Sequence, residues 1–226
     1  MSANGPTTQP LRVLPRGRHA APREVVAESQ RERLLVAMAD AVAAKGYANV
    51  AVADVIERAG VSRRSFYEQF SNKEEAFLAA YDAGVAGLLD AIAEAEEAAR
   101  GDGAGAGGLL AAAHAGTEVY LQLLADNPAF AHTFLVEVLG AGPDALARRD
   151  AVHERFAQRL AEAHAAIAEA AGGLATPQPF IFRAAVGAIH ELVTQRLLAD
   201  GPEALPDLLG PILEVELRLL GAPAAR

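Results

Sequence analysis

The residues best suited to chemistry lie in one short polar stretch, SRRSFYEQF, at residues 62–70. If the stretch is helical, Phe66 and Phe70 share one face and turn toward a core. The remaining faces then carry the side chains of Arg63, Arg64, Ser65, Tyr67 and Glu68. Arginine can donate two hydrogen bonds to a guanine edge, and serine and tyrosine hydroxyls can bind phosphates. This face fits the major groove of DNA, although a solvated surface helix would have the same composition.

A helix this short needs neighbours to be stable. Residues 52–59 predict a second short helix, which a turn at Gly60 joins to the first. A longer amphipathic helix precedes both and ends at Gly46. Its start could lie at Pro22 or at the SQRE capping box that begins at Ser29. The three helices would form a helix-turn-helix head over residues 24–71.

The rest of the chain also reads as helices broken by glycine and proline, so the fold class is all-α. Ser62 is placed to cap the second short helix, and the SNKE sequence from Ser71 predicts a capping box for a helix ending near Arg100. Residues 101–108 have linker composition. Their GxGxxG pattern follows an acidic helix instead of a strand, so we reject a nucleotide site. Further helices are expected near residues 108–126, 128–139, 143–171, 178–200 and 203–220.

Composition and charge narrow the class of protein. The 226 residues contain no cysteine, which excludes disulfides and thiolate metal sites and suits a reducing compartment. No secretory signal and no uninterrupted apolar span are visible, so we expect a cytoplasmic protein that does not enter a membrane. Residues 1–80 hold 11 Arg or Lys against 9 Asp or Glu, whereas residues 81–226 hold 9 against 20, which gives +2 and −11 and together the net charge of −9. A polyanion would therefore meet the N-terminal part.

Several motifs resemble the DNA-binding head of TetR-type repressors, densely over residues 29–85. They are GY at residue 46, VADV at 52, AGVS at 59, SFY at 65, Phe70, and NKE at 72. The resemblance implies that groove and backbone contacts with operator DNA come from Ser62, Arg63, Arg64, Ser65, Tyr67 and Lys73. Two positions depart from the pattern: Ala51 replaces a usual capping Thr or Ser, and Ile56 replaces a usual alanine.

The resemblance also divides the chain. Residues 1–23 would be a flexible basic arm, whose arginines could enter a minor groove or simply be disordered. Residues 24–71 would bind DNA, and residues 72–226, the body, would bind an effector and dimerise. The last expected helix is apolar nearly all round, which calls for more than one partner, so we expect a homodimer through residues 178–220. An ordinary internal core is the alternative interpretation.

By the same resemblance, the middle helices would enclose a pocket for a small-molecule effector. The candidates are aromatic or polar residues within Ala- and Leu-rich segments, each of which could equally be core or surface: His114, Tyr120, Phe130, Phe134, Glu137, Phe156 and His164.

The sequence thus predicts a homodimeric, sequence-specific bacterial transcription regulator, a repressor released by an effector. A helical protein-binding scaffold without DNA affinity is the alternative. An all-α enzyme is least favoured, because no two histidines have helical metal-ligand spacing and only His114 and Glu118 form a His–carboxylate pair four residues apart. We expect no catalytic residue, metal or cofactor.

Overall fold

The computed structural model describes residues 23–101, 105–173 and 175–221, and every regular element within these ranges is a helix. This confirms the all-α class. The predicted basic arm lies outside the described residues except for Arg23, which begins the first helix. The elements are α1 (Arg23–Lys45), η1 (Tyr47–Asn49), α2 (Val52–Ala59), α3 (Arg63–Gln69), α4 (Lys73–Arg100), α5 (Ala106–Asp126), α6 (Pro128–Leu135), η2 (Glu137–Gly140), α7 (Pro143–Ala170), α8 (Pro179–Asp200), η3 (Pro202–Leu208) and α9 (Leu209–Leu220).

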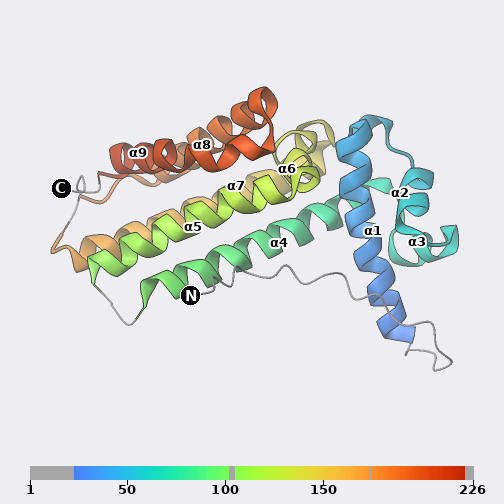
Figure 1. Ribbon diagram of the computed structural model, residues 1–226, viewed down its shortest axis with the longest axis horizontal. Helices are drawn as coiled ribbons and strands as arrows, with labels where there is room; N and C mark the ends of the chain where they lie inside the picture. Colours follow the sequence, from blue (N-terminus) through green and yellow to red (C-terminus); the bar gives the residue numbers. More distant parts are fainter. Residues whose placement is uncertain (1–22, 102–104, 174, 222–226) are drawn as a thin grey trace, which may run out of the picture.

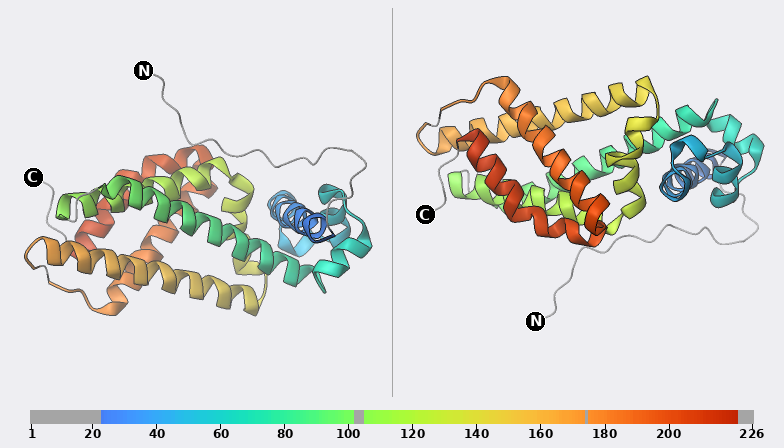
Figure 2. Two further views of the ribbon diagram at one scale, coloured as in Figure 1. Left: turned by 90° about the horizontal axis from the view of Figure 1, so that it is seen from below. Right: turned by 90° about the horizontal axis from the view of Figure 1, so that it is seen from above.

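The long helices of the body run lengthwise beside one another, and α1 crosses their end (Figure 1). Helices α2 and α3 pack on the side of α1 that faces away from the body. Both views in Figure 2 place these three helices together at one end of the molecule. The chain therefore presents α3 at its extremity, where a large partner could reach it.

Local capping explains where the helices of the head begin and end. The Ser62 hydroxyl accepts a hydrogen bond from the Ser65 amide at 3.0 Å, as predicted, and Gly60 ends α2 in the left-handed region with φ of 61°. Ala51 offers no side-chain acceptor at the start of α2. Half of a capping box nevertheless remains, because the Asp54 carboxylate accepts from the Ala51 amide at 2.9 Å.

Predicted helix boundaries need correction at the start of α4 and before α9. The cap of α4 is Asn72, whose Oδ1 accepts from the Glu75 amide at 2.9 Å, while the Glu75 carboxylate accepts from the Ser71 amide at 2.7 Å. The box is thus one residue later than predicted, because Asn competes well with Ser as a cap. Of the two starts considered for α1, the structure agrees with the one at Pro22, since the helix begins at Arg23 and runs through Ser29. The helix predicted at 203–220 begins as the 3₁₀ segment η3, which contains Pro206, and is α-helical only from Leu209.

One hydrophobic cluster of buried residues extends from α1, α2 and α3 into the body, so head and body share a core. Helix α4 contributes buried residues to the core of both the head and the body. By length and composition it could cross a membrane. However, 44% of its most apolar stretch is buried inside the protein, and the helix packs against other helices. A buried core helix satisfies the same criteria as a membrane span, so this property does not indicate a membrane protein.

Candidate functional site

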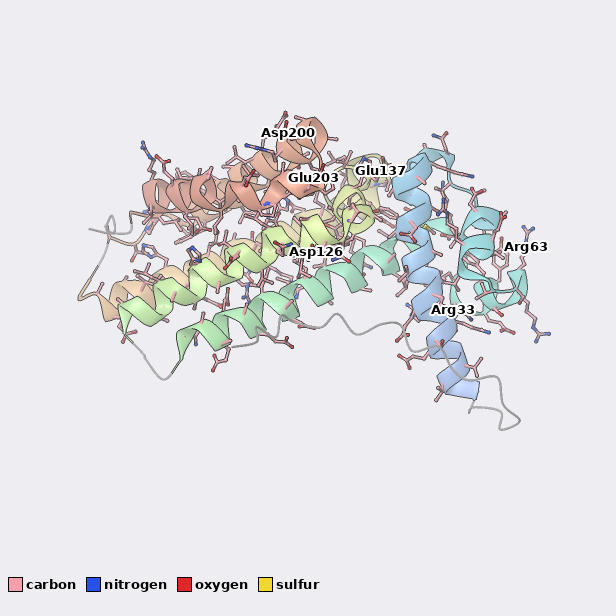
Figure 3. The ribbon with its side chains drawn as sticks, viewed as in Figure 1. Arg33, Arg63, Asp126, Glu137, Asp200 and Glu203 are labelled. Atoms are coloured by element: carbon pink, nitrogen blue, oxygen red, sulfur yellow. The ribbon has the colours of Figure 1, made fainter. Side chains whose placement is uncertain are left out.

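The outer face of α3 is polar and open. The Arg64 side chain is 87% exposed and its Nε lies 2.8 Å from a carboxylate oxygen of Glu68 on the next turn. The Arg63 guanidinium lies 5.8 Å from the centroid of the exposed Tyr67 ring. Figure 3 shows Arg63 at the outer side of the head. This face can reach another molecule without unfolding any part of the core.

The other residues predicted at this surface are more constrained. Ser65 is half-buried, and its hydroxyl lies 2.9 Å from that of Ser62, so both serines already serve the cap of α3. Lys73 lies at the start of α4, where its Nζ donates to the Tyr47 carbonyl at 2.9 Å and sits 4.2 Å from the Tyr47 ring centroid. An ammonium has three N–H donors, so Lys73 keeps donors that this bond does not use.

Glu137 connects the body to the head. Its Oε2 accepts a hydrogen bond from the Tyr47 amide at 2.6 Å, across 90 positions of sequence. Its other oxygen lies 3.7 Å from Nδ1 of His132. Glu137 stands beside the end of α1 in Figure 3. Sequence reasoning expected Glu137 in the effector pocket; instead it holds η1 of the head against η2 of the body.

A cavity of 420 Å³ opens within the body, between α4, α5, α6, α7, α8 and α9. Three of the seven predicted pocket residues line it: Tyr120, Phe134 and Phe156. The Tyr120 and Phe156 rings meet edge to face, with centroids 6.1 Å apart. Most of the remaining wall is aliphatic, including Ile92, Leu160, Val186, Ile189 and Ile212.

The other predicted pocket residues lie outside the cavity, Glu137 among them. His114 is exposed on α5. Phe130 stacks on Phe134 with centroids 5.4 Å apart and fills space in the core beside α4. His164 is buried, and one ring nitrogen lies 2.9 Å from the Leu220 carbonyl, which ties α7 to the end of α9. Packing therefore accounts for Phe130 and His164.

The polar residues of the wall that were not predicted include His153, His190 and Glu216. The imidazoles of His153 and His190 lie 4.7 Å apart, and burial lowers their pKa values to about 3 and about 4, so both are neutral at pH 7. Burial raises the pKa of Glu216 to about 7. In sequence these residues stand in ordinary helical stretches, and only the packing of α7, α8 and α9 brings them to one cavity.

The cavity wall offers little for metal chemistry. Across residues 23–101, 105–173 and 175–221, no group of three or more His, Asp or Glu side chains is arranged to hold a metal ion. The arrangement suits non-covalent binding of an organic molecule, since an apolar wall with a few polar groups is typical of ligand sites.

Comparison with known proteins agrees with this architecture. Residues 34–80 match the sequence model of the bacterial regulatory proteins of the tetR family. No curated protein matches the chain in sequence. The solved structure of the fatty acid degradation regulator FadR from Bacillus halodurans is 19% identical, with a TM-score of 0.72 over 87% of this chain and 97% of that one.

Two further structures have the same fold. FadR from Bacillus subtilis, solved in complex with stearoyl-CoA, is 17% identical, with a TM-score of 0.68 over 84% of this chain and 98% of that one. A transcriptional regulator from Rhodococcus sp. Rha1 is 23% identical, with a TM-score of 0.62 over 84% of this chain and 95% of that one. The likeness therefore spans head and body together.

Proposed function

We propose that the chain, whose residues 34–80 match the sequence model of the bacterial regulatory proteins of the tetR family and whose fold is that of solved transcription regulators, is a homodimeric repressor that an effector in the body releases from operator DNA. The open polar face of α3 is the observation that carries this proposal. Proteins of this family are generally not enzymes, and the proposed place of action is the bacterial cytoplasm. We assign DNA binding to residues 24–71 and effector binding and dimerisation to residues 72–226.

DNA recognition would fall to α3 and the start of α4. Arg63 and Arg64 extend into solvent and can donate to base edges or phosphates, and Tyr67 offers an exposed hydroxyl. Lys73 would bind the DNA backbone with the donors left over from its bond to Tyr47. Glu68 would exchange its contact with Arg64 for solvent when DNA binds. An exposed ion pair contributes at most about 1 kcal/mol, so this exchange costs little.

Dimerisation would use α8 and α9. The outer side of α8 carries the small residues Ala184 and Gly187, both exposed, and nothing lies within 4 Å of where a Gly187 Cβ would be. Leu198 on the same helix is 59% exposed. Leu213 and Leu217 of α9 are only half-buried. A second copy could pack closely against these residues and cover the exposed leucines.

Effector binding would act on the head through α6. Phe134 of α6 lines the cavity, and Glu137, three residues further along, holds the Tyr47 amide. A ligand that displaces Phe134 can therefore displace the head. Coupling of this kind is reciprocal: a ligand that weakens DNA binding tenfold must itself bind tenfold more weakly to the DNA complex.

The test is selection of bound duplexes from a random pool, followed by titration of the selected duplex at several salt concentrations. We expect a roughly palindromic site whose half-sites are separated by one helical turn, about 34 to 36 Å, or slightly more. Affinity should fall steeply with salt, because lysines and arginines displace counterions from the phosphates. A folded dimer with no salt-sensitive duplex affinity would refute the proposal and favour a protein-binding scaffold.

A further inference from the structure

The cavity contains a half-buried carboxylate, that of Glu216, which no described side chain balances. Glu216 lines the cavity from α9 and has no ion-pair partner and no hydrogen bond among the described side chains. Carboxylates in apolar surroundings are ordinarily paired, because an isolated buried charge is costly. The raised pKa of Glu216 reflects that cost.

The other charged groups on the wall do not compensate for Glu216. Arg159 of α7 is bound to Glu96 of α4 at 2.7 Å, and Arg100 lies 3.7 Å from its helical neighbour Glu97. Glu162 adds a further negative charge, at an exposed position. The wall residues Glu96, Arg100, Arg159, Glu162 and Glu216 sum to a charge of −1.

Three neutral polar side chains of the wall, those of His153, His190 and Tyr120, also lack partners. His153 is 5% exposed, lines the cavity, and has no hydrogen-bond partner at Nε2. Neither His190 nor Tyr120 forms a side-chain hydrogen bond within the described part of the chain, and both line the cavity. Because both imidazoles are neutral at pH 7, they supply no cation for Glu216. Arg149 lies close enough to lower the pKa values of both histidines but does not line the cavity.

We propose that the cavity selects a cationic amphiphile: an organic ammonium whose charge pairs with Glu216 and whose apolar part lies against the aliphatic and aromatic wall. The cation would supply the missing partner of the carboxylate. The faces of Tyr120 and Phe156 attract cations as well as apolar groups. This inference rests on the proposed function for the ligand's role as effector, and it concerns the charge of the ligand rather than the binding of DNA.

Three probes with one tail and different head charges test it: octylammonium, 1-octanol and octanoate, titrated calorimetrically into the full chain at pH 8. Glu216 is largely ionised at this pH, so octylammonium should bind at least tenfold more tightly than octanoate. At pH 6 Glu216 is largely protonated and the difference should shrink. Glu216→Gln should abolish most of the preference. Glu214→Gln, which removes a carboxylate from the exposed side of α9, should leave the preference unchanged.

Octanoate binding as tightly as octylammonium, no binding of octylammonium, or an unchanged preference in Glu216→Gln would each overturn the inference. The wild-type ligand series and its pH dependence decide the question even if the Gln variant does not fold. Failure of the regulatory proposal gives a different result, because the chain would then lack salt-sensitive duplex affinity whichever probe it binds.

Discussion

Two glycines of α4 allow a sharp test of how α6 packs on this helix. Gly84 and Gly87 lie one turn apart in the same helix, and both replacements with alanine should gain helix propensity worth about 1 kcal/mol. Their surroundings differ. A Cβ at Gly84 would lie 2.5 Å from Cδ2 of the Phe130 ring, whereas nothing lies within 4 Å of a Cβ at Gly87.

The two changes should therefore differ in their effect on stability. Carbon atoms in contact prefer about 3.5 to 4.0 Å, so Gly84→Ala forces the Phe130 ring or α6 to move. Overpacking of this kind typically costs about 1 to 3 kcal/mol, which offsets or exceeds the gain in propensity. Gly87→Ala should stabilise the protein by about 1 kcal/mol. We expect the variants to differ by roughly 1 to 3 kcal/mol.

Urea unfolding followed by circular dichroism measures this difference, with the double variant Gly84→Ala/Phe130→Leu as a control that leaves more room beside α4. The smaller side chain should recover part of the loss. Equal stabilisation by Gly84→Ala and Gly87→Ala would show that Phe130 does not occupy the space beside Gly84, and would refute this account of the α4–α6 contact.

Four further outcomes are expected. Arg64→Ala should weaken operator binding by roughly 1 to 3 kcal/mol and relax the preference at one base. Lys73→Ala should weaken binding to all duplexes alike and lower the slope of affinity against salt concentration by about one. Unchanged binding in both variants would contradict the assigned DNA-binding surface. Leu217→Glu should give a monomer in sedimentation, because an unpaired carboxylate at an apolar interface is costly, and a dimer that still binds DNA would mean that another face is used. Glu137→Ala, which removes the acceptor of the Tyr47 amide, should leave ligand affinity unchanged but reduce the effect of ligand on operator binding; an undiminished effect would exclude the Tyr47 contact as the connection. The pKa of Glu216 is higher in the folded than in the unfolded state, so the cost of ionising this carboxylate in the folded protein is absent below about pH 4.5 and complete above pH 7. Glu216→Gln should therefore raise the free energy of unfolding by up to about 3 kcal/mol at pH 8 and by less at pH 5. Equal gains at the two pH values would contradict the burial of this carboxylate.

Much of the fold could be predicted from the sequence, because short-range signals set the helix boundaries. Gly60 and Gly46 end helices with positive φ, and Ser62 caps α3 through its own side chain. The errors arose where two local signals compete. Ser71 and Asn72 are both good caps, and η3 has enough apolar residues to read as part of α9 despite Pro206.

The cavity could be predicted only in part, because its wall depends on contacts between distant helices. Tyr120 and Phe156 could be predicted as wall residues because they are large aromatic residues in Ala-rich segments. Phe130 has the same property but packs on Phe134 outside the cavity wall. Nothing near Glu216 in sequence distinguishes it from Glu214. Only the orientation of α9 about its own axis places Glu216 at the cavity and Glu214 in solvent. Glu137 finds its partner 90 residues away, at a backbone amide that has no sequence signature.

Tyr47 takes part in both contacts that would carry a signal to DNA. Its amide is held by Glu137 of the body, and its carbonyl and ring hold Lys73. A movement of Glu137 therefore acts first on the lysine assigned to the DNA backbone, whereas Arg63 and Arg64 lie on α3, which is held in place by the buried residues Phe66 and Phe70. If Lys73 binds phosphate, the effector changes how long the regulator stays on a promoter and leaves its choice of promoters unchanged. The same set of genes would then be controlled at every effector concentration, and only the level of expression would vary.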